Sequence, residues 1–221
     1  MELSERTEDG SRLAALLWRA GPGWRMLSTG VLGGGLGERS WVLNAQVPGG
    51  YARMDPVTHL TEIAASLHAT GPGVGLLTAA DVRARRRATD TGVWTVATVG
   101  VGTPSWAAFP GAAGDAPGAP PPGTINIVVA LPVAMEDAAL VNLVATVTEA
   151  KVQALLDAGH AATGTPSDAV CVAVRTDGPA EPFGGPRSTW GARTARAVHA
   201  AVLTGARADR QRRETASTLL Q

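Results

Sequence analysis

The stretch that decides the fold reads GTINIVVALP over residues 123–132, MEDAALVNLVATVTEAKVQALLDAG over 135–159 and ATGTPSDAVCVAV over 162–174. The β-branched runs at its two ends predict strands, and the long middle segment predicts a helix. Glu136 and Asp137 place negative charge in the first turn of that helix, where it complements the helix dipole, and Gly159 follows as a stop signal. The sequence therefore predicts a strand, a helix, a polar turn and a second strand.

One stripe of the predicted helix carries a charge among apolar side chains. Spacings of three and four residues place these positions on a single face: Leu140, Val144, Val147, Lys151 and Leu155. The flanking positions are mostly Ala, Val and Leu, which predicts a helix buried nearly all round. Lys151, Glu149 and Asn142 then each need a partner, because an unpaired buried charge is costly. Polar groups in an apolar setting indicate a functional segment.

Length and composition restrict the class of protein. The chain has 221 residues, of which 45% are hydrophobic and 17% charged, so we expect a single domain over 1–221 with a core at about 24–205. A formal net charge of zero argues against a protein that coats nucleic acid. No apolar run reaches the roughly 20 residues of a membrane span. The single Cys171 and an N-terminus unlike a signal peptide favour the cytoplasm.

The remaining segments supply further strands and helices. Residues up to Gly10 are expected to be frayed, and residues 11–18 to form a short amphipathic helix. Asp55 and Pro56 are typical of an N-cap and a first helical residue. We expect strands at 24–29, 41–47, 74–78 and 93–99, a last helix at 192–203, a mobile Pro/Gly insertion at 109–122 and a loose charged tail at 207–221.

The two halves of the chain share an order of elements. Each contains a strand, a glycine-containing turn, a strand with a central Asn, a helix and a strand. Asn44 and Asn126 occupy matching positions, and Glu62 and Glu149 lie on the two helices. The pattern predicts an α/β (α+β) fold with a duplicated β-β-α-β unit, a mixed sheet and a C-terminal helix. Two equivalent sets of loops would form a shared cleft, the natural place for a ligand.

Gly33 and Gly34 belong to a glycine run that lacks the context of a phosphate-binding loop. Glu38 and a strand follow the run, whereas a P-loop or a dinucleotide fingerprint needs a following helix. The run forms either a hairpin turn with positive φ or a place where the backbone approaches a bulky ligand. The four arginines within residues 83–87 are more typical of a solvated turn than of a phosphate or nucleic-acid patch.

Polar residues on the first predicted helix raise the question of a metal. His59 and Glu62 share one face, which allows a metal pair or a general base. No second His or Cys stands nearby at ligand spacing, so capping by Asp55 and exposure to solvent are the simpler interpretation. Cys171 alternates with apolar neighbours and is interpreted as a core residue rather than a nucleophile.

The turn TGTPSD at residues 163–168 is rich in hydroxyls and stands directly before a strand. Such a turn can bind a carboxylate or an amide oxygen. Thr165 or Ser167 could form a hydroxyl–amine pair with Lys151, in the Ser–Lys style of activation. The alternative is local turn chemistry, in which Asp168 and Thr163 bond the neighbouring backbone.

These residues resemble the signature blocks of the adenosylcobinamide amidohydrolase (CbiZ) family. The blocks are GTIN at 123–126, TEAK at 148–151 and ATGT at 162–165 with Asp168, and STG at 28–30, the strand with Asn44, TAA at 78–80 and Gly191 fit in the same order. The resemblance covers about 27–202. Each tetrapeptide alone is weak, but the ordered set is specific. The segments 109–122 and 83–87 depart from the pattern as loop additions.

The resemblance implies an enzyme of corrinoid salvage for cobalamin biosynthesis. Such enzymes hydrolyse the amide that joins the aminopropanol arm to the corrin ring of adenosylcobinamide, giving adenosylcobyric acid and 1-amino-2-propanol. The expected partner is therefore this small corrinoid, with no nucleic acid and no membrane span. A divalent metal as cofactor and a homo-oligomeric state stay open. The alternatives are a non-catalytic corrinoid-binding or regulatory module and an amidohydrolase for another amide.

Amide hydrolysis needs a nucleophile, oxyanion stabilisation and a proton for the leaving amine. The first mechanism is attack by water with Glu149 as base, because burial favours proton uptake by a carboxylate. The second uses Thr165 or Ser167 as a covalent nucleophile, and the third a metal at His59 and Glu62. The candidate catalytic residues are Glu149, Lys151, Thr165 and Asp168, and the candidate substrate-binding residues are Asn44, Asn126, Thr163, Gly164, Gly33 and Gly34.

Overall fold

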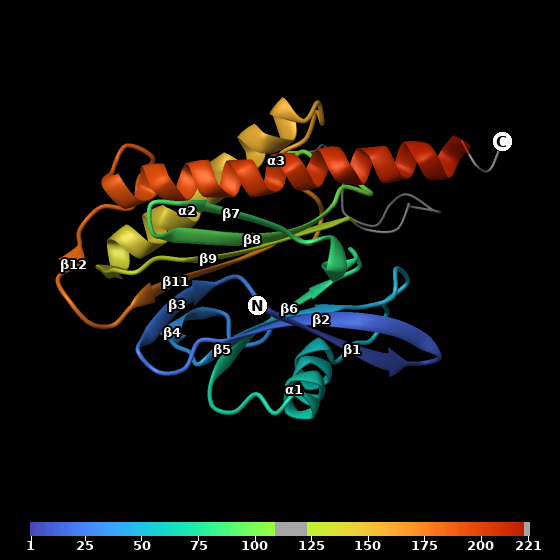
Figure 1. Ribbon diagram of the computed structural model, residues 1–221, viewed down its shortest axis with the longest axis horizontal. Helices are drawn as coiled ribbons and strands as arrows, with labels where there is room; N and C mark the ends of the chain where they lie inside the picture. The colour runs from blue at the N-terminus through green and yellow to red at the C-terminus, as the bar shows by residue number, and fades with distance from the viewer. Residues whose placement is uncertain (109–122, 219–221) are drawn as a thin grey trace.

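The computed structural model describes residues 1–108 and 123–218, so the predicted insertion at 109–122 lies outside the described residues. The protein consists of four layers (Figure 1). Helix α1 (Pro56–Ser66) covers a four-stranded sheet, which stacks on a six-stranded sheet. Helices α2 (Asp137–Asp157) and α3 (Thr189–Thr218) cover the far side of the six-stranded sheet. The predicted α+β class, with mixed sheets and a C-terminal helix, is confirmed.

The four-stranded sheet has the order β1-β2-β5-β6. Its strands are β1 (Glu2–Glu8), β2 (Ser11–Arg19), β5 (Trp41–Gln46) and β6 (Gly73–Thr78). The pairs β1–β2 and β2–β5 are antiparallel. Strands β5 and β6 are parallel, and α1 crosses over between them, as a parallel pair requires.

The N-terminal segment corrects two expectations, because it is neither frayed nor helical. Strands β1 and β2 form a hairpin whose turn residues Asp9 and Gly10 both have positive φ, 48° and 75°. This Asp–Gly turn is itself a hairpin signal that the sequence displays. The run from Leu13 to Leu17 is buried on both faces of the sheet, so it lacks the alternation that marks a half-exposed strand.

The six-stranded sheet has the order β4-β3-β11-β9-β8-β7. Its strands are β3 (Trp24–Ser28), β4 (Gly35–Glu38), β7 (Arg86–Asp90), β8 (Val93–Gly100), β9 (Thr124–Ala130) and β11 (Ala169–Arg175). Strands β9 and β11 are parallel with α2 crossing over between them, and the other pairs are antiparallel. A short parallel pair joins β10 (Ala134–Met135) to β12 (Ala180–Glu181). The arginine run at 83–87 is not a simple turn, because it passes through the 3₁₀ helix η1 (Val82–Ala84) into edge strand β7.

The predicted duplication of a β-β-α-β unit is not confirmed. Each half does contain a parallel β-α-β crossover, β5-α1-β6 in one sheet and β9-α2-β11 in the other. However, the strand expected to open the first unit, β3, pairs with β4 and β11 in the six-stranded sheet rather than with β5. The two sheets therefore exchange strands, and the halves are not separate copies of one unit.

Apolar side chains from both sheets fill the space between them: Met26, Val42, Val74, Leu76, Val128, Ala130, Cys171 and Ala173. Cys171 has no exposed surface, and its burial raises the pKa of the thiol to about 12. The prediction that Cys171 is a core residue is confirmed. A second cluster between the six-stranded sheet and helices α2 and α3 includes Ile125, Ile127 and Val129 from β9.

The two long helices differ from expectation in their exposure. Helix α2 is not buried all round, because Val141 and Leu156 are 59% and 48% exposed and Asn142 and Glu149 are also exposed. Helix α3 continues to Thr218, so residues 207–218 are helical rather than a loose tail. By length and composition alone α2 passes as a membrane-crossing helix. However, half of its most apolar window is buried in the protein, which gives that criterion little weight.

Candidate active site

Lys151 and Asp168 form a buried ion pair at the centre of the site. Lys151 comes from α2, where the apolar stripe holds it against the protein, and Asp168 ends the turn before β11. Nζ of Lys151 lies 2.5 Å from Oδ2 of Asp168, and the two side chains are 10% and 11% exposed. A Cβ on Gly164 would lie 2.4 Å from this carboxylate and 2.7 Å from the Lys151 amine, so only glycine fits beside the pair. The Lys151 amine therefore contacts the turn at Asp168, rather than at the hydroxyl of Thr165 or Ser167 as the predicted hydroxyl–amine pair required.

Asp168 also organises the backbone around it. Its Oδ2 accepts a hydrogen bond from the backbone N–H of Thr165 at 3.1 Å, and its Oδ1 accepts one from the N–H of Ile125 at 2.9 Å. The hydroxyl of Thr165 lies 2.5 Å from the same Oδ1. The carboxylate therefore holds the turn against the first residues of β9. The same hydrogen bonds stabilise the turn and position the residues of the candidate site.

The carbonyl oxygen of Gly123 is the point where two hydroxyls of the turn converge. Oγ1 of Thr165 donates to it at 2.8 Å and Oγ of Ser167 at 3.0 Å. Ser167 also lies 2.8 Å, hydroxyl to hydroxyl, from Thr124, the first residue of β9. Because Thr165 carries one hydroxyl proton, it donates either to the Gly123 carbonyl or to Asp168. Two hydroxyls that converge on one carbonyl oxygen resemble an oxyanion hole, with Ser167 as its donor when the Thr165 proton is on the Asp168 side.

Asn44 and Asn126, the two asparagines predicted to bind the substrate, lie in the interior between the sheets and hydrogen-bond each other. The side-chain amide of Asn126 donates to Oδ1 of Asn44 and to the carbonyl of Leu77, each at 2.9 Å, and Asn44 donates to Oγ1 of Thr98 at 3.0 Å. The two residues are 1% and 2% exposed. Oδ1 of Asn126 is buried without a hydrogen-bond partner among the described residues. The two asparagines are not among the residues that line the cleft described next.

A cleft of about 250 Å³ opens where β6 and β8 end and β9 begins. Its lining residues are Gly49, Ala79, Ala80, Asp81, Val99, Gly100, Gly123, Thr124, Asp209, Arg212 and Arg213. Gly123 and Thr124 connect it directly to the hydroxyl cluster. The cleft therefore gives a small ligand access to the group of residues that Asp168 organises.

The sequence-based prediction missed the α3 side of this cleft. Asp209 is 7% exposed and accepts hydrogen bonds from the N–H of Val101 at 3.0 Å and from Arg213 at 2.8 Å. Arg212 lies 3.2 Å from the other oxygen of the same carboxylate. A signal was present, because Val198, Val202, Ala206 and Asp209 continue one helical stripe past the predicted end at 203.

Glu149 does not join the site that its neighbours form. It lies on the exposed face of α2, whereas Lys151 points into the protein. The burial that would have favoured proton uptake by Glu149 is absent. Thr163 lies closer to the site: its hydroxyl accepts the N–H of Ala107 at 2.7 Å and thereby holds the backbone bridge between Ser105 and Gly164.

Gly33 and Gly34 lie in the loop between β3 and β4, two strands of the six-stranded sheet, and the neighbouring Leu32 forms a bridge to Gly75 of β6. Gly33 has a positive φ of 64°, and a Cβ there would lie 1.9 Å from the carbonyl oxygen of Gly73. A Cβ on Gly34 would likewise lie 2.4 Å from the carbonyl oxygen of Gly30. Gly33 also borders a groove of about 490 Å³ beside Arg39 and Trp41, which shares no lining residue with the cleft.

His59 and Glu62 have protein partners instead of a common ligand. The two ring nitrogens of His59 lie 2.9 Å from Glu8 and 3.0 Å from the hydroxyl of Tyr51. Glu62 lies 3.4 Å from Arg53. Within residues 1–108 and 123–218, no group of three or more His, Cys, Asp or Glu side chains is arranged to hold a metal ion.

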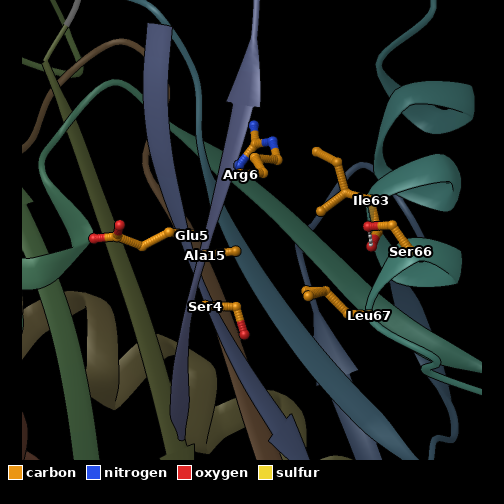
Figure 2. A pocket seen from close by; sticks show the side chains of 7 residues that line it. All are labelled: Ser4, Glu5, Arg6, Ala15, Ile63, Ser66 and Leu67. Atoms are coloured by element: carbon orange, nitrogen blue, oxygen red, sulfur yellow. Dashed lines mark hydrogen bonds between the residues drawn. The ribbon is translucent and has the colours of Figure 1, made fainter.

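A separate pocket lies between the β1–β2 hairpin and α1 (Figure 2). Figure 2 shows Arg6 and Ser4 on the strand side and Ile63, Ser66 and Leu67 on the helix side. The guanidinium of Arg6 is occupied, because it bonds Glu8 at 3.0 Å and the carbonyl of Gln46 at 2.6 Å. This pocket shares no lining residue with the cleft that holds Thr124.

Comparison with known proteins identifies the family of the chain. The sequence model of the adenosylcobinamide amidohydrolase family matches residues 1–214. A protein of Halobacterium salinarum named adenosylcobinamide amidohydrolase is 37% identical over 188 residues, which cover 83% of this chain and 80% of that protein. A protein of the same name from Methanosarcina mazei is 30% identical over 188 residues, covering 81% and 88%. The chain therefore belongs to the adenosylcobinamide amidohydrolase family.

Proposed function

We propose that the protein hydrolyses the amide bond between the aminopropanol arm and the corrin ring of adenosylcobinamide, and that the reaction takes place at the Thr124 end of the cleft. The products are adenosylcobyric acid and 1-amino-2-propanol. The names of the two relatives support the substrate. A single free thiol, Cys171, is consistent with work in the cytoplasm.

The observation that carries the proposal is the convergence of Thr165 and Ser167 on one carbonyl oxygen beside the Lys151–Asp168 pair. Hydrolysis of an amide passes through a tetrahedral intermediate whose oxygen carries negative charge. Hydroxyl donors fixed in advance stabilise that charge without reorganisation at the moment of reaction. A protein that only binds a corrinoid has no need for such donors next to a buried ion pair.

Each member of the cluster then has a defined part. Asp168 orients the hydroxyl of Thr165, and Lys151 compensates the negative charge that Asp168 brings into the interior. Ser167 is the second donor, and its contact with Thr124 places a further hydroxyl at the cleft. Glu149 is exposed and has no part in the cluster. The mechanism in which Glu149 activates a water molecule is therefore not favoured, and we assign the attack to a hydroxyl of the cluster.

The size of the cleft decides how the substrate sits. At about 250 Å³ the cleft is smaller than the roughly 300–1,000 Å³ that a whole small molecule occupies. It therefore takes the aminopropanol arm and the amide, while the wide corrin ring stays at the mouth. Arg212 and Arg213 stand at that mouth on α3.

The test is direct incubation of the purified protein with adenosylcobinamide, with chromatographic detection of adenosylcobyric acid. We expect product with the wild type and with Glu149→Gln, and a loss of at least about 10²-fold in rate for Asp168→Asn, as for removal of an oxyanion donor. Binding of the corrinoid without product would indicate a binding module. Neither binding nor product would contradict the corrinoid assignment.

A further inference from the structure

We propose that the chain cleaves its own peptide bond between Gly123 and Thr124, and that the new N-terminal Thr124 is the nucleophile of the hydrolase. This inference rests on the proposed function and names the attacking group that the function requires. It assigns the bond from three observations: the environment of the Gly123 carbonyl, the position of the Thr124 hydroxyl and the contact of that hydroxyl with Ser167.

The contacts around the carbonyl oxygen of Gly123 resemble those that an enzyme makes to the carbonyl of its substrate. The hydroxyls of Thr165 and Ser167 lie 2.8 and 3.0 Å from its oxygen. Asp168 lies 2.5 Å from the Thr165 hydroxyl and competes for its single proton, so Ser167 donates to the carbonyl while Asp168 holds Thr165 beside it. A Cβ on residue 123 would lie 2.5 Å from the carbonyl oxygen of Gly100, so only glycine allows this close approach. The same donors that we assign to the substrate oxyanion already surround a peptide carbonyl of the chain itself.

The hydroxyl of Thr124 adjoins that carbonyl along the chain and also borders the cleft. Thr124 is 4% exposed and is one of the cleft-lining residues. A serine or threonine hydroxyl can attack the carbonyl of the preceding residue through a five-membered ring. The Thr124 hydroxyl is therefore placed to attack first the peptide bond of the chain and then the amide of a bound substrate.

In the uncleaved chain the Thr124 hydroxyl has a hydroxyl, not a base, as its hydrogen-bond partner, because Ser167 lies 2.8 Å away. A threonine hydroxyl is a weak nucleophile until a base removes its proton. Proximity compensates for this in attack on the adjoining carbonyl of the chain, but attack on a separate substrate needs the base. Cleavage before Thr124 supplies the base, since it frees the α-amine of the same residue. An α-amine has a pKa of about 7.7–8.0, close to the neutral pH at which a general base works best.

The cleavage takes place in two steps, in which every bond broken is matched by a bond formed. In the first, Oγ1 of Thr124 bonds to the carbonyl carbon of Gly123, the bond from that carbon to the Thr124 nitrogen breaks, and the hydroxyl proton passes to the nitrogen, leaving an ester and a free amine. In the second, one water molecule hydrolyses the ester. The products are a Gly123 carboxylate and a Thr124 with free α-amine and hydroxyl, with no oxidant or reductant needed.

The test is the intact mass of the full-length protein, purified from cells and denatured immediately. We expect two chains of 123 and 98 residues in place of one chain of 221. N-terminal sequencing of the smaller chain should begin TINIVV. Two other Gly–Thr bonds, Gly102–Thr103 and Gly164–Thr165, are internal controls, and cuts at those bonds or at scattered positions would indicate an outside protease and overturn the inference.

Variants separate chemistry from folding. Thr124→Ala should remain one chain with unchanged circular dichroism and no turnover. Thr124→Ser keeps the hydroxyl and should still cleave. Thr204→Ala is the matched control, because Thr204 is an exposed threonine bonded to its own helix, and it should cleave like the wild type. Cleavage of Thr124→Ala, or failure of Thr124→Ser with intact fold, would contradict the proposal.

The donors give an independent readout. Thr165→Val and Ser167→Ala each remove one hydroxyl from the Gly123 carbonyl, so each should slow cleavage by about 10²-fold, seen as a growing share of full-length chain. A full-length, uncleaved wild type that still produces adenosylcobyric acid would overturn the inference and leave the hydrolase assignment intact. A cleaved protein that leaves adenosylcobinamide unchanged would support the cleavage and contradict the substrate.

Discussion

The side-chain amide of Asn126 donates a hydrogen bond of 2.9 Å to Oδ1 of Asn44, across the space between the two sheets. This contact joins the six-stranded sheet to the four-stranded sheet where apolar packing gives way to the cleft. Both side chains are almost fully buried, so water cannot replace either partner. The pair therefore sets how the two sheets register at the active end of the molecule.

Asn44→Leu should destabilise the protein more than the loss of one hydrogen bond. The substitution leaves an N–H of Asn126 and the hydroxyl of Thr98 without their partner, and a buried unsatisfied group costs about 1–3 kcal/mol. Asn44→Leu combined with Asn126→Leu should cost less than the sum of the single changes, because both partners are then removed. Urea unfolding of the four proteins measures this coupling, and strictly additive costs would show that the contact does not matter.

Lys151→Met should lower stability and abolish turnover together. It leaves the Asp168 carboxylate buried without its counter-charge, and removal of one partner of a buried pair costs about 3–5 kcal/mol. Glu149→Gln, two residues away on the exposed face of α2, is the matched control and should stay within about 0.5 kcal/mol of the wild type. Equal effects of the two changes would show that Lys151 acts only as a member of the helix.

His160 should make stability fall at mildly acid pH. Burial first, and then the charge of Arg210, hold the pKa of His160 below its ordinary value of 6.5. The unfolded chain therefore takes up a proton at His160 before the folded protein does, so the free energy of unfolding decreases as pH falls from about 6.5 toward the lowered pKa. We expect His160→Asn to flatten this slope between pH 5 and about 7 in thermal or urea unfolding.

His68→Asn, at an exposed position, serves as the control for that measurement. If the stability of His160→Asn followed the same pH dependence as the wild type, the titration would have to arise elsewhere.

Cys171 should not react with thiol reagents in the folded protein. The reactive species is the thiolate, and burial raises the pKa of this thiol to about 12, so almost none is ionised at pH 8. We expect no reaction with a chromogenic disulfide reagent under native conditions and one thiol per chain in urea. Rapid native labelling would indicate that the two sheets open.

Elements with a strong local signal could be predicted from the sequence. Strands β5, β6 and β8 and the helix ending at Gly159 appear within a few residues of their expected bounds, because β-branched runs and a helix stop act locally. The turn at 163–168 was also recognisable, since hydroxyls, glycine and Asp168 in that order suit a tight polar turn. The β1–β2 hairpin shows the limit: its strand β2 is buried on both faces, and such a run has no period that separates strand from helix.

The amino-acid sequence by itself determined that the chain carries Lys151 on an apolar helical stripe, a hydroxyl-rich turn ending at Asp168 and two central asparagines, and these patterns sufficed for the family. Only the tertiary structure decided that Lys151 faces Asp168 while Glu149 faces solvent, and that Thr165 and Ser167 converge on the carbonyl of Gly123. Periodicity gives the face on which a side chain lies, but the stacking of layers decides which face is covered. The proposed active centre lies where the start of β9 meets a turn more than forty residues away.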